Sequence, residues 1–278
     1  MNPKMQAYVN DNYEYKALRT ADGSPSLLMG EKQAFEMQAP EAMHNSAGAL
    51  TESFYIYYEN IRSAQEHHLR PSYLSVGLGL GYNEAIIACH ALKENLNPLK
   101  LSILSFERDA FIRENYVNWL LQDAKKQKTK KEGSEQNKAE DFWGPIFTEV
   151  LQVVAKHMKM DWKSAKHLLK SMYNEGSFKI ENDMLTYDWA GNKRKFTSIL
   201  FDAFSKKSTP DVWSEEFITR FLQSAADEKC ILTTYAATGS LNRALRNNHF
   251  TLVDRKGFQG KRESTWAERL ELHDKTFL

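Results

Sequence analysis

One stretch constrains this chain more than any other, because an apolar run passes directly into closely spaced glycines. Residues 73–83 read Tyr-Leu-Ser-Val-Gly-Leu-Gly-Leu-Gly-Tyr-Asn. Glycine lets the backbone turn sharply, and its missing Cβ lets a ligand approach the main chain. Dinucleotides, S-adenosylmethionine and plain tight turns all use Gly-x-Gly-x-Gly. The stretch therefore predicts a strand, a turn and a helix, with Gly77, Gly79, Gly81 and Asn83 at a candidate cofactor site.

After this turn, strand-like and helix-like patterns alternate, which favours a doubly wound α/β sheet. Before it, residues 54–58 read either as a strand or as the opening of an aromatic helix. The strands that we expect are 73–76, 101–106, 185–188, 197–201, 230–235 and 250–254, and the helices are 61–69, 84–94, 108–121, 146–158, 162–172, one opened by 210–217, and 240–247.

Two parts lie outside this alternation. Residues 1–70 carry no cofactor signature, so we expect an N-terminal extension packed on a main domain of residues 71–278. Within the extension, His44 and Glu52 read as surface or capping residues. The main domain holds a helical, Lys-rich insertion at about 122–175. Its lysine run serves either as a solvated face or as a contact for phosphates.

Three carboxylates follow strand-like runs. Glu107 ends the second run, where an acid can accept both hydrogen bonds of a ribose diol or cap the next helix. Asp188 can reach the adenine end of a cofactor or serve as a turn aspartate. Asp202 directly follows the run 197–201, and a carboxylate at the carboxyl end of a central parallel strand points into the crevice where such sheets bind ligands.

Composition permits a substantial core and leaves the chain with almost no net charge. The 278 residues are 42% hydrophobic and carry a net charge of +1, so the chain has no global attraction for nucleic acid. Any RNA contact then needs a local basic patch. The loop 255–263 is the most concentrated one, and it suits either a phosphate backbone or a solvated β-hairpin turn.

Cysteine and histidine positions argue against a metal site and a disulfide framework. Only Cys89 and Cys230 are present, and His157 and His167 have no partners at metal-ligand spacing. The first residues lack an apolar signal segment, and no window is apolar enough to span a membrane. We therefore expect a cytoplasmic protein without a metal.

Several short motifs, in this order and spacing, resemble the methyltransferase domain of the tRNA 5-methylaminomethyl-2-thiouridine biosynthesis protein (MnmC-like) and its free-standing relatives. The match is spread over most of the chain, and several motifs in order are more specific than any one of them. The motifs are residues 48–53, 77–83, 105–107, 201–204, 210–213, 234–239, 256–258 and 260–263.

This resemblance implies a class I fold with a seven-stranded, mostly parallel sheet that binds S-adenosylmethionine and acts on tRNA. The implied reaction is N-methylation of the 5-aminomethyl group of a modified (2-thio)uridine at the wobble position. Because the chain stops at Leu278, shortly after the basic loop, we expect a free-standing form without the flavin oxidase domain and without FAD.

The site residues expected on these grounds fall into three groups. Asp202 is the catalytic candidate, since a carboxylate can orient an alkylammonium by charge-assisted hydrogen bonds and take its proton. Phe204 and Tyr235 either wall the site and stack a base or pack in the core. The cofactor-binding candidates are Gly77, Gly79, Gly81, Asn83, Glu107 and Asp188, and the substrate-binding candidates are Phe204, Tyr235, Lys261 and Arg262.

Other function classes stay open at this point. Ser75, Leu80 and Lys206 differ from the residues usual in the family, and this would suit a non-catalytic or differently specific cofactor-binding relative. A nicotinamide-dependent oxidoreductase shares the glycine turn, but it does not predict the spacing from Asp202 to Trp213 or the basic loop.

Overall fold

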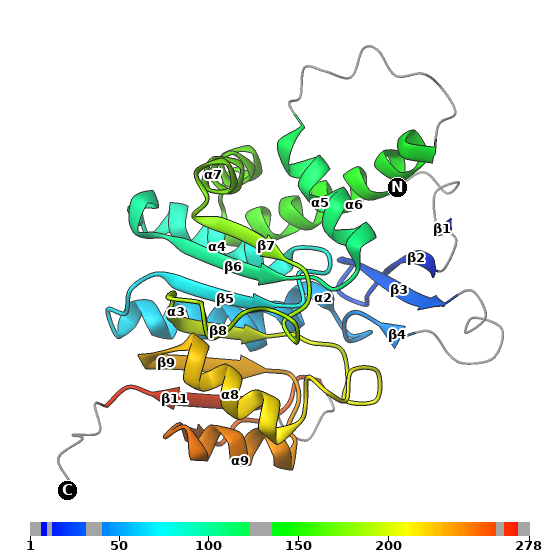
Figure 1. Ribbon diagram of the computed structural model, residues 1–278. Helices are drawn as coiled ribbons and strands as arrows, with labels where there is room; N and C mark the ends of the chain where they lie inside the picture. The colour runs from blue at the N-terminus through cyan, green and yellow to red at the C-terminus, as the bar shows by residue number, and fades with distance from the viewer. Residues whose placement is uncertain (1–6, 10–12, 32–40, 123–134, 260–263, 272–278) are drawn as a thin grey trace, which may run out of the picture. The chain divides into compact units, whose positions relative to one another are not determined.

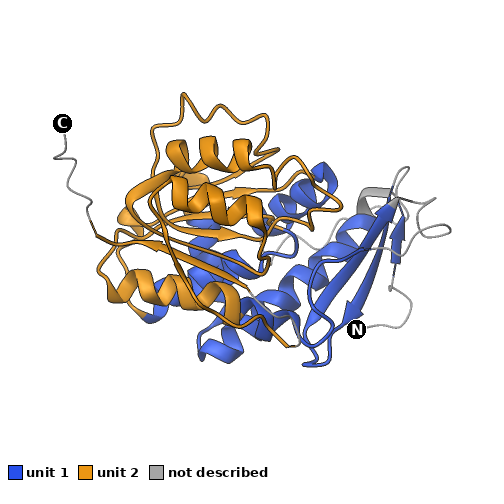
Figure 2. Ribbon diagram, turned by 90° about the horizontal axis from the view of Figure 1, so that it is seen from below, with its two compact units in different colours: residues 1–53, 79–93, 109–171 blue, residues 54–78, 94–108, 172–278 orange. Residues whose placement is uncertain are grey.

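A computed structural model describes residues 7–9, 13–31, 41–122, 135–259 and 264–271. The chain forms two compact units that interleave along the sequence (Figure 1 and Figure 2). The two units are defined only by how compactly their residues pack. They do not test the expected extension 1–70 or the insertion at about 122–175, which stay predictions. Unit 1 comprises residues 1–53, 79–93 and 109–171, and unit 2 comprises residues 54–78, 94–108 and 172–278.

Within the described residues, unit 2 contains one sheet of seven strands. The strands are β5 (Ser72–Val76), β6 (Ser102–Phe106), β7 (Phe178–Glu181), β8 (Phe196–Phe201), β9 (Ala226–Thr234), β10 (Thr251–Val253) and β11 (Thr265–Arg269). Their spatial order is β10-β11-β9-β8-β5-β6-β7, and every pairing is parallel except the two made by β11. This confirms the predicted mixed α/β fold with a mostly parallel, doubly wound sheet.

The path of the chain reverses at the centre of this sheet. From β5 the chain moves outward to β6 and β7, then returns to β8 on the other side of β5. Both β5 and β8 are buried along their whole length, as is usual for central strands of a parallel sheet. The carboxyl ends of β5 and β8 therefore flank a topological switch point, where sheets of this kind bind ligands.

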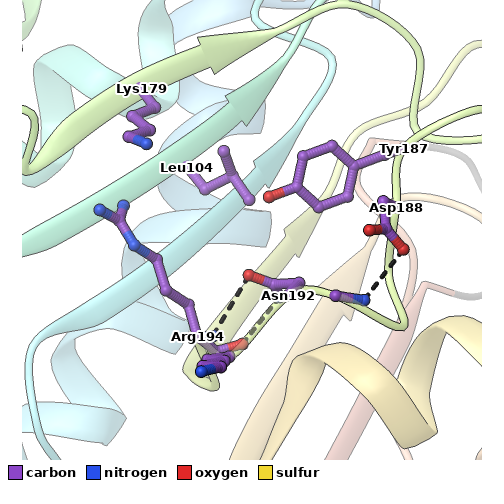
Figure 3. Close-up of a pocket in the computed structure, with 8 residues that line it drawn as sticks. Leu104, Lys179, Tyr187, Asp188, Asn192 and Arg194 are labelled. Atoms are coloured by element: carbon purple, nitrogen blue, oxygen red, sulfur yellow. Dashed lines mark hydrogen bonds between the residues drawn. The ribbon is translucent and has the colours of Figure 1, made fainter.

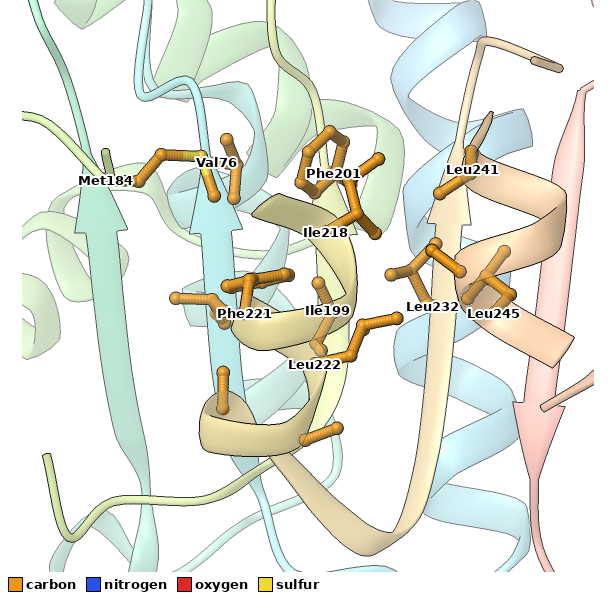
Figure 4. Close-up of a cluster of buried hydrophobic side chains, with 14 of the residues drawn as sticks. Val76, Met184, Ile199, Phe201, Ile218, Phe221, Leu222, Leu232, Leu241 and Leu245 are labelled. Carbon is orange, nitrogen blue, oxygen red and sulfur yellow. The ribbon is translucent and has the colours of Figure 1, made fainter. Parts of the chain in front are cut away.

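Helix α8 (Glu215–Ala225) carries the core of unit 2 (Figure 4). The Oγ of Ser214 accepts a hydrogen bond from the backbone N of Phe217 at 3.3 Å, which caps the first turn. Ile218, Phe221 and Leu222 recur at helical spacing and face the buried residues of β5, β8 and β9. The other helical segments of unit 2 are a π-helix η1 (Phe54–Tyr58), α3 (Glu59–Glu66), a 3₁₀ turn η2 (Pro98–Lys100) and α9 (Gly239–Asn247).

Unit 1 contains a second sheet, which the sequence did not lead us to expect. Its described strands are antiparallel and run in the order β1-β2-β3-β4. Aromatic rings of Tyr15, Phe111 and Trp143 pack against one another in this unit. The elements are β1 (Ala7–Val9), β2 (Tyr13–Arg19), β3 (Pro25–Glu31), β4 (Glu41–Ala42), α2 (Ala49–Ser53), α4 (Tyr82–Lys93), α5 (Ala110–Leu121), α6 (Glu135–Met158) and α7 (Trp162–Glu175), the last of which enters unit 2 at residue 172.

A network of short hydrogen bonds fixes the start of α2 in unit 1. The Asp22 carboxylate accepts from the backbone N and the hydroxyl of Thr51, both at 3.0 Å. Glu52, read from the sequence as a surface or capping residue, is only 6% exposed and accepts from the backbone N of Asn45 at 2.7 Å. Glu52 is therefore buried and holds the loop before α2, so the surface alternative is wrong for it.

The expected strand at 185–188 is wrong, because the third parallel strand is β7, which ends at Glu181. Residues 183–186 form a turn in which the backbone N of Leu185 donates to Asp183 Oδ1 at 2.9 Å. Leu185 and Tyr187 pack against the core instead of pairing in the sheet. Leu185 and Tyr187 are bulky residues that contact the core from a turn, and in the sequence this short stretch resembles the pattern of a strand.

No helix in the described part of the chain has both the length and the apolar character needed to cross a lipid bilayer.

Candidate cofactor and catalytic site

The switch point brings Gly77 against Asp202, both in unit 2. Gly77 has a φ of 84°, and its backbone N donates to Phe106 O at 3.1 Å. The backbone N of Asp202 donates to Val76 O at 2.9 Å. A Cβ on Gly77 would lie 2.3 Å from Asp202 O, so both the conformation and the close approach require glycine here.

The Asp202 carboxylate is held by a tyrosine that the sequence analysis missed. Tyr57 donates its hydroxyl hydrogen to Asp202 Oδ1 at 2.7 Å, and its side chain is only 2% exposed. Tyr57 belongs to the π-helix η1, a rare form that is frequent at functional sites. The carboxylate is therefore fixed by a buried donor while Asp202 itself is half-buried.

Glu107 lies directly after β6 and is 7% exposed. Its backbone N donates to Glu181 O at 3.0 Å, so Glu107 lies beside the last residue of β7 at the carboxyl edge of the sheet. The alternative that Glu107 caps the next helix is not what the structure shows. Asp109 is the N-cap of α5, and its side chain accepts from the backbone N of Phe111 at 2.8 Å. The ribose role of Glu107 remains a prediction.

The glycine loop continues into unit 1, where Gly79 and Gly81 have φ values of 50° and 81°. A Cβ on Gly81 would lie 2.5 Å from Cε2 of Tyr116 on α5, so this glycine lets the loop approach that ring. Asn83 stands in the first turn of α4 and is 2% exposed. The cofactor roles of these three residues stay predictions.

Asp188 lies in a turn, which was the alternative interpretation of its sequence. Its Oδ1 accepts from the backbone N of Gly191 at 2.9 Å, and the residue is exposed. Asp183 is a carboxylate that the sequence analysis missed, because β7 was expected too late in the chain. It lies two residues after β7, and its Oδ2 is 3.6 Å from Nε of Arg108, the neighbour of Glu107.

The segment after Asp202 is braced by side-chain donors. Tyr235 donates its hydroxyl hydrogen to Ala203 O at 2.9 Å, and Trp213 Nε1 donates to Phe204 O at 2.7 Å. Phe204 and Tyr235 are both half-buried. Tyr235 therefore has a structural task in this segment, and the expected contact of both rings with a substrate base stays a prediction.

The described part of the basic loop is tied to the π-helix. The guanidinium of Arg255 lies 4.3 Å from the ring centre of Tyr55 and 5.2 Å from that of Trp266. Arg255 Nη2 also donates to Tyr55 O, and Tyr55 donates its hydroxyl hydrogen to Lys256 O at 2.8 Å. Arg255 thus anchors the described part of the loop between the antiparallel strands β10 and β11, and both sequence alternatives for this loop stay predictions. Lys261 and Arg262 lie outside the described residues.

Among the described residues, no group of three or more histidine, cysteine, aspartate or glutamate side chains is arranged to hold a metal ion.

The chain is similar to known proteins in sequence and in fold. Residues 137–269 match the model of a family described as S-adenosyl-L-methionine-dependent methyltransferase. Two relatives are named tRNA 5-methylaminomethyl-2-thiouridine biosynthesis bifunctional protein MnmC. The one from Campylobacter hominis is 39% identical over 64 residues, 23% of this chain and 9% of the relative. The one from Hahella chejuensis is 32% identical over 79 residues, 28% of this chain and 12% of the relative.

A solved structure extends the likeness to most of the fold. The crystal structure of MNMC2 from Aquifex aeolicus matches with a TM-score of 0.56 and 21% identity, over 92% of this chain and 70% of that one. The matched stretches thus cover only a small part of the curated relatives, while the fold is shared almost throughout. In family model, sequence and fold, the chain resembles the S-adenosyl-L-methionine-dependent methyltransferases of the MnmC type.

Proposed function

We propose that the chain transfers a methyl group from S-adenosylmethionine to the amine of a 5-aminomethyl(-2-thio)uridine at the wobble position of tRNA. The observation that carries this proposal is the Asp202 carboxylate, which lies at the switch point beside Gly77 and is held by Tyr57 at 2.7 Å. The likeness to MnmC proteins supports the substrate.

The residues at the carboxyl edge of unit 2 fit such a cofactor. The buried Glu107 carboxylate follows β6, where it would accept the hydrogen bonds of a ribose diol. At the end of β5, Gly77 keeps the main chain close to Asp202. When bound, S-adenosylmethionine supplies an electrophilic methyl group on a sulfonium. The chain must then hold the substrate amine in line with that methyl group and accept the proton that the ammonium gives up.

Asp202 is suited to that second task. An alkylamine is mostly protonated at neutral pH, and its nitrogen needs a free lone pair to attack a methyl carbon. A carboxylate oriented by Tyr57 would hold the ammonium by charge-assisted hydrogen bonds and take its proton. As the new N–C bond forms and the C–S bond breaks, a fixed carboxylate also keeps the amine in an attacking position.

The test is incubation with S-adenosylmethionine carrying a labelled methyl group and tRNA from cells blocked in the last wobble-uridine methylation. Nucleosides are then separated and identified by mass spectrometry. We expect the label in 5-methylaminomethyl(-2-thio)uridine. Label in another nucleoside would overturn the assigned acceptor, and cofactor binding without any transfer would support the non-catalytic alternative instead.

A further inference from the structure

The crossover from β7 to β8 lacks the helix that usually joins parallel strands. Residues 182–195, all of them described, form turns and irregular structure, whereas successive strands of a parallel sheet are usually linked by a helix that covers the sheet. Part of the β6–β7 face is therefore left to a loop, and a cavity of about 370 Å³ lies there (Figure 3). Its lining residues are Leu104, Lys179, Tyr187, Asp188, Gly191, Asn192, Lys193 and Arg194.

Among the lining residues of this cavity, basic side chains outnumber acidic ones. Lys179, Lys193 and Arg194 line it, and none of the three forms an ion pair with a described residue. Asp188 is the acidic residue in the lining, and its carboxylate accepts from Gly191 N in the turn. In Figure 3 the Lys179 amine and the Arg194 guanidinium lie toward one end, and Asp188 lies toward the other, beyond Tyr187.

Arg194 is held in place from two sides. Its Nη2 donates to Gly176 O at 3.1 Å. The Asn192 side chain accepts from Arg194 N at 3.2 Å and donates to Arg194 O at 2.9 Å. The other guanidinium nitrogen, Nη1, is shielded from solvent and has no acceptor among the described residues. Arg194 thus keeps one shielded guanidinium donor without an acceptor, which is costly for a charged group.

We propose that this cavity binds a phosphate group of an RNA strand, with Lys179, Lys193 and Arg194 as its donors. A guanidinium matches the spacing of two phosphate oxygens, and flanking lysines add charge without fixing direction. The choice of RNA rests on the proposed tRNA substrate, and the same chemistry would also accept free inorganic phosphate.

The test compares the full chain with the variant Lys179→Ala/Lys193→Ala. Both lysines are exposed, so their removal spares the core. The matched control is Lys156→Ala/Lys229→Ala, which removes two exposed lysines elsewhere and changes the net charge equally. Binding of bulk tRNA is measured over a series of salt concentrations, binding of inorganic phosphate by calorimetry, and folding by thermal denaturation.

We expect the pocket variant to bind tRNA about tenfold more weakly than the wild type, with the slope of log K against log salt reduced by about 1. The control should keep the wild-type affinity. Loss of inorganic phosphate binding with unchanged tRNA affinity would overturn RNA as the ligand and assign the site to the free anion. Equal tRNA and phosphate binding by wild type, variant and control would overturn the proposal.

A separate assay keeps this result apart from the proposed reaction. Cofactor titration and methyl transfer are measured on the same variants. Weakened tRNA binding in a chain that transfers no methyl group to any nucleoside would support the pocket and overturn the proposed function. Normal transfer together with tRNA and phosphate binding unchanged in the variant would support the function and overturn the pocket.

Discussion

At the scale of single residues, the hydrogen bond between Tyr57 and Asp202 is the contact most open to experiment. It joins a buried hydroxyl to a carboxylate that lies 145 positions later in the sequence. A neutral donor to a charged acceptor contributes more than a neutral pair does. Tyr57 therefore acts as a positioning residue for Asp202 under the proposed function.

Replacing Tyr57 by Phe should lower kcat about tenfold, because the carboxylate loses the donor that orients it. Cofactor affinity should stay unchanged, since Tyr57 is not among the residues expected to bind the cofactor. Tyr58→Phe is the control, because it removes a hydroxyl from the same π-helix. Equal rates for the two variants in a steady-state methyl-transfer assay would show that the hydrogen bond has no catalytic role.

Asp202 and Glu107 should respond in opposite ways to loss of charge. Asp202→Asn keeps the shape of the side chain and should lower kcat by about 10²–10⁴, the usual contribution of a general base. Its affinity for S-adenosylmethionine should be retained. Glu107→Gln should weaken that affinity about tenfold by losing charge-assisted hydrogen bonds. Calorimetric titration of both variants with S-adenosylmethionine measures these affinities. An unchanged dissociation constant for Glu107→Gln would exclude the ribose role.

At the scale of elements, the turn after β5 and the strand end of β8 depend on one glycine. Gly77 combines a φ of 84° with a space that a Cβ would fill at 2.3 Å from Asp202 O. Gly176 has a similar φ of 77°, but a Cβ there would meet no atom within 4 Å. A comparison of the two positions therefore separates the cost of a left-handed backbone conformation from the cost of the close approach to Asp202.

Gly176→Ala should lower the free energy of unfolding by about 1–2 kcal/mol, the cost of a left-handed conformation for a residue with a Cβ. Gly77→Ala should cost about 1–3 kcal/mol more, because the strand ends must also move apart. Urea denaturation of both variants measures the difference. Equal losses would mean that the carboxyl ends of β5 and β8 are not held as closely as described.

The sequence predicted those elements whose apolar runs are long and central. The strands β5, β6, β8 and β9 lie where their patterns indicated, and Glu107 and Asp202 directly follow β6 and β8. The strand β7 was misplaced because it has four residues, one of them the exposed Lys179. In the sheet of unit 1, β1 and β4 were missed because they have three and two residues, and β2 because Glu14 and Lys16 interrupt its apolar residues. Tyr57 could not be linked to Asp202 because only the tertiary fold joins them.

At the scale of the whole molecule, stability should depend on pH through His44 in unit 1. His44 is half-buried, its Nδ1 lies 2.9 Å from Ser26 Oγ, and its ring packs edge-on against Tyr82. Burial lowers the pKa of His44 from 6.5 to about 4, although the charge of Asp22 acts in the opposite direction. The folded chain therefore holds the neutral imidazole.

As the pH falls from 6.5 to 4, the unfolded chain takes up a proton at this histidine before the folded chain does. The free energy of unfolding should then fall by at most about 3 kcal/mol across that window. Urea denaturation at several pH values gives the slope. His44→Asn should flatten it, and an unchanged slope in that variant would assign the pH dependence to other groups.

The position of β11 has a consequence for the order of events during synthesis. In the sheet β11 lies between β9 and β10, both of which precede it in the sequence, and among the described strands β10 pairs with β11 alone. While a ribosome is still adding residues 254–264, β10 has been made but has no strand to join. That edge of the sheet can close only after translation has passed Arg269, so a nascent chain stalled before this point exposes an incomplete edge to chaperones and proteases.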